Sequence, residues 1–416
     1  MKILIATPLW PNAQHTVRGG NIIIFEMIRI LAEQPDVSVV VQKVSKPNDP
    51  LPTGDEFASQ KILASLPGVT VVEEYRQAEN EIAPRRADRW RILFPRVSDY
   101  YPDWPGRERW HQHVLAQKPD VVLVPLSEWI TAMTSGLAVK TYVYYGNPDP
   151  KSRRRRDDFS LEHKRIGTLE YRKRRWDMAH LERFHLKIMR EISHCGNVSL
   201  NDAEYYTARG HSNAFYVPHL WTDHPPTVNA FDREPKPLAP VRVIANIGKL
   251  DATANRDGLL VLADQMLPLF QSGEFQWEIL GANKLDAHVR QRLERPDVLF
   301  RGWVQDIDDE MASAQLFLCL NNASPYKVGH TRYLHAMSLG CCIVAHQDVR
   351  LSMPELIDRE NCLLGSSMGE IAELLREAAV SPALRALVGR GALKTFQEKF
   401  TGHAVVPQII ARLKTD

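Results

Sequence analysis

Apolar and polar positions along the chain form blocks that predict strands connected by helices. Residues 2–10 (KILIATPLW) are an almost unbroken apolar run typical of a buried strand, and apolar residues at helical spacing follow at 22–31. Further strands are expected in the first half at 37–41, 69–74, 121–124 and 141–145. Because Val and Ile runs without polar alternation are typical of parallel strands covered on both faces, this half predicts a doubly wound sheet.

A long amphipathic stretch is expected over residues 160–192. Its predicted buried stripe contains the apolar residues Ile166, Leu169, Trp176, Leu181, Phe184 and Ile188. Strands at 195–200 and 215–218 are expected to complete the first half of the chain.

The second half repeats the alternation after a break. Residues 221–240 contain five prolines and no periodicity, which predicts a linker. Strands are then expected at 241–245, 276–280, 298–300, 316–320 and 342–345. The domain prediction is an N-terminal domain at 1–222, a linker at 223–240, a second domain at 241–402, and a helix at 403–416 that can return to the first domain.

This pattern predicts an α/β protein with two Rossmann-like domains that face each other across a cleft. In such sheets ligands bind at the carboxyl ends of the strands, so the loops that follow the strands are the places to search for chemistry.

Composition excludes several classes of protein. The chain has 416 residues, and 52 Lys and Arg against 50 Asp and Glu leave a net charge of +2, so no global field favours a polyanion. No apolar run reaches the roughly 18 residues needed to span a bilayer, and a cytoplasmic location is expected. The five cysteines form no Cys-x-x-Cys pair, which predicts a reducing compartment and a role in the core.

Five landmarks follow one another in the second half. They are Asn246-Ile247-Gly248-Lys249, Leu280-Gly281, residues 298–304, residues 334–344, and Met353-Pro354-Glu355-Leu356. In this order they resemble the C-terminal donor-binding domain of GT-B glycosyltransferases, in particular the retaining family-four type, over residues 241–400. The first half agrees through Gly19-Gly20 and residues 198–203.

The resemblance implies transfer of a sugar from a nucleotide-sugar donor to a saccharide or lipid-linked saccharide, in bacterial surface-glycan biosynthesis. A nucleoside diphosphate carries about two negative charges, which cations and helix N-termini stabilise. Gly248 and Lys249 occupy the family's glycine and basic positions, and Arg256 lies near its second basic position. Arg332 is a further candidate cation. Gly19 and Gly20 suit a close approach of the backbone to the donor.

Two positions depart from the family's pattern. Its signature has a Glu, seven residues and a second Glu before Ala-Met, where this chain has Lys327 and His335. His335 can still make one bond to a ribose hydroxyl, and Glu355 can help, whereas Lys327 cannot accept a hydrogen bond. Either the donor sugar is unusual, for example by carrying a carboxylate, or the site is rebuilt or lost.

Candidate acceptor-side residues follow the first-half strands. The family commonly has a His after the fifth strand, but this chain has Asn147 and Asp149, with Asp149 the first choice as base. Residues 127–128 come next, and His15 can orient an acceptor hydroxyl. The resemblance implies no protein nucleophile, no metal and no cofactor. The triplet 306–308 (Asp-Ile-Asp) is interpreted as a helix cap rather than a metal site.

A basic segment leaves several interpretations open. Residues 151–190 carry fourteen Lys or Arg against six Asp or Glu, and aromatic residues are frequent at 85–113. This composition fits a solvated helix face, contact with a glycan, a lipid-linked acceptor or the inner membrane, or nucleic acid. Sugar transfer is the leading function. The alternatives are a catalytically silent GT-B binding module and a sugar transferase that modifies nucleic acid.

Overall fold

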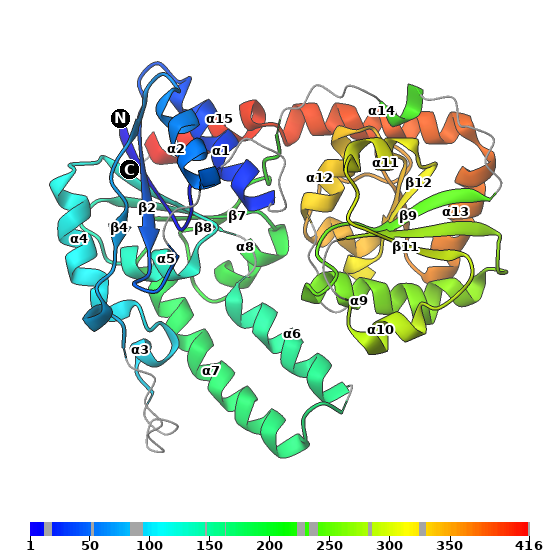
Figure 1. Ribbon diagram of the computed structural model, residues 1–416, viewed down its shortest axis with the longest axis horizontal. Helices are drawn as coiled ribbons and strands as arrows, with labels where there is room; N and C mark the ends of the chain where they lie inside the picture. Colours follow the sequence, from blue (N-terminus) through cyan, green and yellow to red (C-terminus); the bar gives the residue numbers. More distant parts are fainter. Residues whose placement is uncertain are drawn as a thin grey trace. The chain divides into compact units, whose positions relative to one another are not determined.

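The computed structural model describes residues 1–11, 19–50, 54–83, 95–145, 148–162, 164–222, 229–232, 240–281, 285–323 and 330–414. The chain forms two compact units. We call Met1–Val198, Asp202–Thr222 and Val405–Asp416 the N-terminal unit, and Ser199–Asn201 with Asp223–Ala404 the C-terminal unit. Each is built around its own parallel sheet covered by helices (Figure 1), which confirms the predicted α/β architecture.

The N-terminal sheet has the strand order β3-β2-β1-β5-β6-β7-β8, with β4 paired to β2. All of these pairings are parallel. The strands are β1 (Lys2–Thr7), β2 (Ser38–Ser45), β3 (Val69–Val71), β4 (Tyr75–Arg76), β5 (Val121–Pro125), β6 (Lys140–Tyr145), β7 (His194–Asn197) and β8 (Ala214–Tyr216). Ile3, Leu4 and Ile5 of β1 are fully buried, as expected for a strand covered on both faces.

Helices connect these strands and cover the sheet. They are α1 (Gly19–Ala32), α2 (Gly54–Ala64), α3 (Val97–Tyr100), α4 (Arg107–Ala116), α5 (Glu128–Thr134), α6 (Asp149–Glu162), α7 (Thr168–Arg190), α8 (Leu200–Thr207) and α15 (Gly402–Lys414). Helices α6 and α7 lie side by side as a hairpin that extends away from the sheet (Figure 1).

The prediction of one amphipathic stretch over 160–192 is wrong in two respects. The segment is divided between α6 and α7, and Gly167 is the N-cap of α7. Leu169 and Trp176, predicted to be buried, are 83% and 55% exposed. Leu181 and Ile188 are buried as predicted, and the core also receives Met178, His185 and Met189 of α7.

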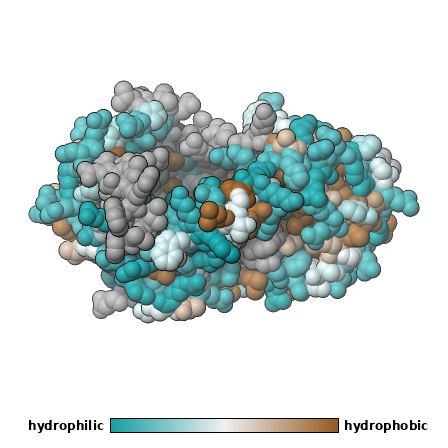
Figure 2. Space-filling model, turned by 90° about the horizontal axis from the view of Figure 1, so that it is seen from below, coloured by the Kyte–Doolittle hydropathy of each residue, from teal (hydrophilic) through white to brown (hydrophobic). Residues whose placement is uncertain are grey.

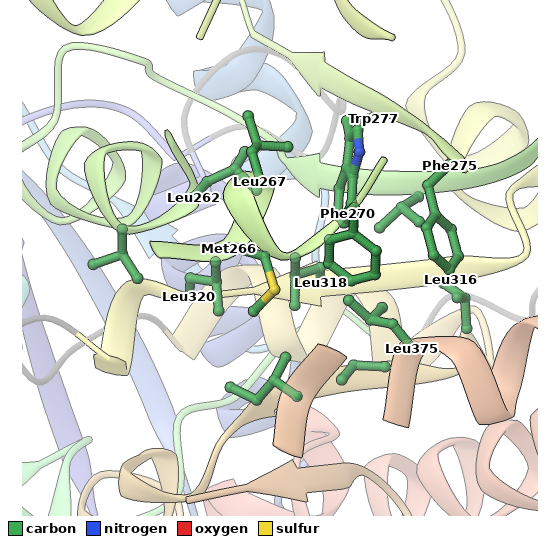
Figure 3. Packing of buried hydrophobic residues seen from close by; sticks show 14 of the residues in the cluster. Leu262, Met266, Leu267, Phe270, Phe275, Trp277, Leu316, Leu318, Leu320 and Leu375 are labelled. Carbon is green, nitrogen blue, oxygen red and sulfur yellow. The ribbon is translucent and has the colours of Figure 1, made fainter. Parts of the chain in front are cut away.

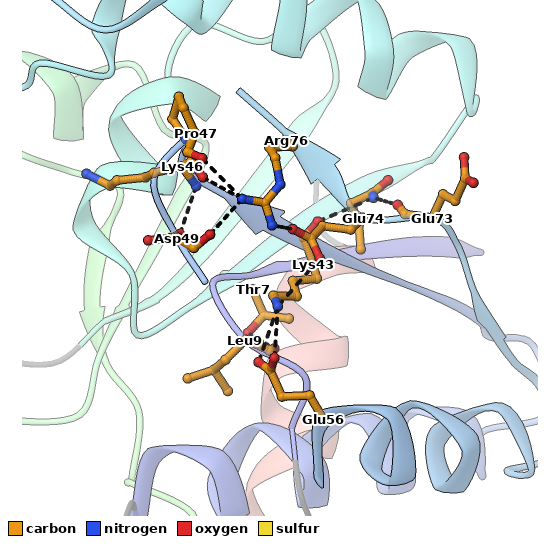
Figure 4. A network of polar contacts seen from close by, with 11 residues as sticks. Thr7, Leu9, Lys43, Lys46, Pro47, Asp49, Glu56, Glu73, Glu74 and Arg76 are labelled. Carbon is orange, nitrogen blue, oxygen red and sulfur yellow. Dashed lines mark hydrogen bonds and ion pairs between the residues drawn. The ribbon is translucent and has the colours of Figure 1, made fainter. Parts of the chain in front are cut away.

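A polar network stabilises the edge of the N-terminal sheet near the end of β2 (Figure 4). The Nζ atom of Lys43, which is buried, lies 3.2 Å from Glu56 Oε1 and 3.5 Å from Glu74 Oε2. Arg76 donates to Glu74 and to the carbonyl oxygens of Lys46, Pro47 and Asp49. Lys43, Glu56, Glu74 and Arg76 each lie beside an opposite charge, so we interpret the cluster as structural.

The C-terminal sheet is also parallel, with the order β11-β10-β9-β12-β13-β14. Its strands are β9 (Val241–Asn246), β10 (Phe275–Leu280), β11 (Val298–Gly302), β12 (Leu316–Cys319), β13 (Ile343–His346) and β14 (Leu363–Gly365). Its helices are α9 (Thr253–Val261), α10 (Ala287–Arg292), α11 (Ile307–Ser313), α12 (His330–Ser338), α13 (Met368–Val380) and α14 (Pro382–Lys399). Strand β14 was not predicted from the sequence.

The core of the C-terminal unit lies between its sheet and helices (Figure 3). Phe270, Phe275 and Trp277 pack against one another with ring centroids 5.1 to 5.5 Å apart. Full burial of such side chains stabilises the fold by about 1.5 to 3 kcal/mol each. The five cysteines are buried and free, which confirms the prediction that they fill the core. Burial raises the pKa of the Cys195 and Cys342 thiols to about 12, so both are protonated at neutral pH.

Two segments connect or extend the units. In the linker region, residues 229–232 include a short 3₁₀ turn, and the Phe231 ring lies where a side chain at Gly340 would be. Helix α15 contributes Val405, Val406 and Ile409 to the buried set, and Leu413 O accepts a bond from Lys140 Nζ at 3.2 Å. Within the described residues, no helix is long and apolar enough to cross a membrane.

Candidate functional site

The order of the strands identifies one candidate binding edge in each sheet. In the N-terminal sheet the chain runs from β1 outward through β2 and β3, then returns to β5 on the other side. In the C-terminal sheet it runs from β9 through β10 and β11 and returns to β12. The loops after β1 and β5, and after β9 and β12, therefore separate at a topological switch point, where α/β sheets bind their ligands.

The turn after β9 is shaped by Gly248 and Asn255. Gly248 has φ +93°, a conformation that side chains rarely adopt, and Lys249 next to it is exposed. Asn255 of α9 donates from Nδ2 to the carbonyl oxygen of Lys249 at 2.6 Å. A methyl group at Gly281, after β10, would collide with the Gly248 carbonyl oxygen. The protein itself thus holds Lys249 at the end of β9.

Arg332 brings a buried cation to the same edge. It lies in α12, is 9% exposed, and donates from Nη1 to Asn246 Oδ1 at 3.0 Å. Among the residues described, no carboxylate pairs with Arg332, and Asn246 Nδ2 is buried without a hydrogen-bond partner. A buried charge is unfavourable unless an opposite charge compensates it, so this guanidinium is suited to an anionic ligand.

Two asparagines after β12 fix α12 and α9 against this edge. Tyr333 of α12 donates from its hydroxyl to Asn322 Oδ1 at 3.2 Å and to Cys319 O at 3.3 Å. Asn321 donates from Nδ2 to Asn255 Oδ1 at 3.4 Å. The two asparagines were not predicted from the sequence. They directly follow the apolar run of β12, and other candidate residues were chosen because they follow a predicted strand.

His335 has a protein partner. Its Nε2 lies 2.6 Å from Oδ1 of Asp308, which belongs to α11. This contact was not predicted from the sequence. The triplet that contains Asp308 starts α11 as expected, because Asp306 Oδ1 accepts from Asp309 N at 2.9 Å; the capping interpretation is confirmed. The ribose contact of His335 stays a prediction.

Two further donor-side candidates are placed by the structure. Arg256 is mostly buried in α9, with Nη2 at 3.6 Å from Asp257 Oδ1, rather than extended from the turn as an isolated cation. Glu355 follows β13 and is half-buried, and its carbonyl oxygen accepts from Asn361 Nδ2 at 2.9 Å. Their donor contacts stay predictions.

The switch point of the N-terminal sheet has a different character. Gly20 lies at the start of α1, as Gly19 does, and a Cβ at Gly20 would be 3.5 Å from Leu126 Cδ1. Leu126, after β5, has φ +50°, an uncommon conformation for a leucine that often marks a functional segment. The next residue, Ser127, has a buried hydroxyl without a hydrogen-bond partner among the described residues.

A buried carboxylate follows β7 in the same unit. Asp202 is fully buried and accepts from Lys151 Nζ at 2.7 Å. Burial raises the pKa of Asp202 to about 6, and Lys151 opposes this rise. In the sequence, Asp202 belongs to the segment 198–203 that carries part of the resemblance, and no role was predicted for it.

Three candidates, His15, Asn147 and Lys327, lie outside the described residues. Asp149 is the first residue of α6, and its predicted role as base is untested. In the part of the chain that the structure describes, no group of three or more His, Cys, Asp or Glu side chains is arranged to hold a metal ion.

Comparisons with known proteins relate part of the C-terminal unit to a family and nearly the whole chain to a fold. Residues 241–379 match the family model described as glycosyl transferases group 1. No curated protein matches the chain. Among solved structures, HepE from Anabaena in complex with UDP has a TM-score of 0.61 at 14% identity, with 99% of each chain covered.

Two synthases have similar folds. Sucrose-phosphate synthase from Thermosynechococcus elongatus has a TM-score of 0.60 at 14% identity and covers 99% of this chain and 98% of its own. The α,α-trehalose-phosphate synthase (UDP-forming) from Burkholderia xenovorans, in complex with glucose-6-phosphate, has a TM-score of 0.61 at 11% identity over 100% of both chains. The chain is therefore a GT-B fold protein. Its C-terminal unit carries the match to glycosyl transferases group 1.

Proposed function

We propose that the protein transfers a sugar, with retention, from a nucleotide-sugar donor to a saccharide or lipid-linked saccharide acceptor. The observation that carries the donor assignment is the edge formed by Lys249 and Arg332, within residues that match the group 1 family. HepE was solved with UDP and the trehalose-phosphate synthase with a sugar phosphate, which supports a nucleotide donor and a saccharide acceptor here.

The proposed chemistry needs charge stabilisation more than a protein nucleophile. The bond between the anomeric carbon and the leaving phosphate breaks, the acceptor oxygen bonds to the same face of that carbon, and the acceptor proton passes to the departing phosphate. Lys249 and Arg332 would stabilise the negative charge that develops on the diphosphate. We propose that no metal ion or other cofactor takes part.

The setting is proposed to be bacterial surface-glycan biosynthesis in the cytoplasm, with peripheral contact with the inner face of the membrane. Lipid-linked acceptors lie at such a surface. The lipopolysaccharide outer core galactosyltransferase WaaB has a similar fold, with a TM-score of 0.56 at 13% identity, and its printed name supports this setting for the proposal.

Calorimetric titration of the full chain with nucleoside mono- and diphosphates tests the donor site. We expect at least one diphosphate to bind, and Arg332→Met to weaken that binding. Binding of no nucleotide would overturn the enzyme proposal and favour the catalytically silent module. Retention is tested separately by proton NMR of the anomeric centre once a donor and an acceptor are found, and an inverted product would contradict it.

A further inference from the structure

Helix α7 presents two faces of opposite character. At about 100° per residue, the buried residues Met178, Leu181, His185, Ile188 and Met189 form one face. On the opposite side, within about 60° of a single line along the helix, lie Leu169, Arg172, Lys173, Trp176, Arg183 and Lys187. We call these six residues the outer face of α7. All six are exposed.

The carboxylates of the hairpin lie away from the outer face. They pair with arginines that are not part of that face. Arg154 bonds to Glu182 at 2.7 Å, Arg155 to Glu162 at 2.7 Å, and Arg174 to Asp157 at 3.1 Å. A second set of contacts joins Arg174 to Glu170, Arg175 to Asp158 at 4.0 Å, and Tyr100 to Asp177. The hairpin therefore has two groups of basic residues. One group pairs with carboxylates of α6 and α7, and the other lies on the outer face of α7.

The cations of the outer face have no ion-pair partner among the described residues. Among the described residues, no carboxylate lies within ion-pair distance of Arg172, Lys173, Arg183 or Lys187. Each is therefore placed to contact a ligand directly. From residue 169 to residue 187 the face extends about 27 Å along a straight helix, at 1.5 Å per residue.

Two apolar side chains interrupt the row of cations. Leu169 is 83% exposed and Trp176 is 55% exposed, among the most exposed large apolar residues described in the chain. They are seven residues apart, so both point to the same side of α7. Figure 2 views the molecule from the side toward which the hairpin extends, and there the described surface is mainly hydrophilic with isolated hydrophobic residues.

We propose that the outer face of α7 docks the protein on a membrane surface rich in anionic lipids. Cations that lie along one line match a plane of negative headgroups, and each basic residue near such a surface contributes about five-fold in affinity. Tryptophan settles at the boundary between headgroups and acyl chains, and Leu169 inserts beside it. This deepens the proposed membrane contact by naming its residues, and vesicle binding can be measured whether or not the protein transfers sugar.

A membrane fits this face better than nucleic acid does. Recognition of single strands uses several aromatic rings on which bases stack, whereas the outer face contains one. An aliphatic leucine that is almost fully exposed has no role in phosphate contacts but gains free energy when it enters an acyl-chain region.

Sedimentation of the full chain with vesicles tests the proposal. Wild-type protein should bind vesicles of phosphatidylglycerol and phosphatidylcholine in equal parts, and not phosphatidylcholine alone. The outer-face variant R172Q/K173Q/R183Q/K187Q should bind about 100-fold or more weakly, given about five-fold for each cation. A control variant, R154Q/R155Q/R174Q/R175Q, loses the same charge from residues inside the hairpin and should retain most of the binding.

A second pair of variants isolates the apolar contribution. Trp176→Ala should weaken vesicle binding several-fold, whereas Trp303→Ala should not, since Trp303 is 68% exposed in the C-terminal unit. If the two charge variants lose vesicle binding equally, binding depends on total positive charge and not on the outer face of α7. That result would overturn the proposal. Wild type that ignores anionic vesicles, or that binds duplex DNA or RNA instead, would also overturn it. Nucleotide titration of the same preparations tests the transferase function independently.

Discussion

The binding edges of the two sheets use glycine and charge in different ways. After β9 and β10, Gly248 and Gly281 are required by the fold, because one has φ +93° and the other has no room for a methyl group. After β1, Gly20 has room for one, with Leu126 Cδ1 at 3.5 Å. The C-terminal edge buries a cation, Arg332, without a carboxylate in the described region, whereas the N-terminal unit buries the carboxylate of Asp202 beside a lysine.

The difference shows that the C-terminal binding edge is preorganised by contacts within the protein. In the C-terminal unit the protein's own contacts determine the path of the backbone, and a buried charge is left for a ligand. In the N-terminal unit the charges compensate each other and space remains at the start of α1. The variants below separate fold-determined features from ligand-determined ones.

Gly281→Ala should have the largest effect on stability. The new methyl group would collide with the backbone at Gly248 and lie 2.8 Å from Leu250 Cδ2, so the ends of β9 and β10 must separate. We expect a loss of about 3 kcal/mol in the free energy of unfolding, at the upper end for overpacking. Chemical denaturation measures it. An unchanged midpoint would show that this edge is not as tightly shaped as described.

Asp202→Asn should change how stability depends on pH. The pKa of Asp202 is raised from 3.8 to about 6 in the folded protein, so the stabilisation that its protonated form provides is complete below about pH 4 and lost as pH rises through 6. Relative to wild type, the variant should therefore gain up to about 3 kcal/mol between pH 4 and 7, at 1.36 kcal/mol per pKa unit. Urea denaturation across that range tests this, and a constant difference would contradict it.

Arg332→Met should separate ligand binding from stability. Loss of a charge-assisted contact of about 2 kcal/mol should weaken nucleoside diphosphate binding about 30-fold. The free energy of unfolding should change by less than about 1 kcal/mol, because removal of a buried uncompensated charge offsets the bond lost by Asn246. Calorimetry and denaturation measure the two effects. A large loss of stability with unchanged binding would make Arg332 a structural residue.

Lys249→Ala should have a smaller effect on binding. Because this side chain is exposed, its ionic contact is partly screened, and we expect about five-fold to ten-fold weaker diphosphate binding. A nucleoside monophosphate should lose less if the ammonium group addresses the distal phosphate. Titration of both nucleotides decides, and equal losses would contradict that position for the charge.

Gly20→Ala should leave stability within about 0.5 kcal/mol of wild type, the smallest change of the set, since the methyl group makes only an ordinary contact. If the space beside Gly20 receives the donor, turnover with a nucleotide sugar should nonetheless fall. Thermal melting and an activity assay measure the two quantities. Normal turnover would remove Gly20 from the site.

Local sequence patterns predicted the strands and the glycine turn because both depend on neighbouring residues. Unbroken Val and Ile runs lie within observed strands, and Gly248-Lys249 follows one of them. The contact between Arg332 and Asn246 joins residues 86 positions apart, which no local pattern encodes. Trp176 was misplaced for a related reason: periodicity shows that α7 has faces but does not identify which of them meets the sheet.

Helix α15 has a consequence for synthesis of the protein. Residues 405–414 are translated after the whole C-terminal unit, yet they group with the N-terminal unit, where Arg412 lies over the Phe215 ring at 4.6 Å. Domains usually fold in the order in which they leave the ribosome. Here the first unit to emerge lacks its last helix until the second unit has been made, so the N-terminal unit is expected to reach its final structure only after α15 has been translated.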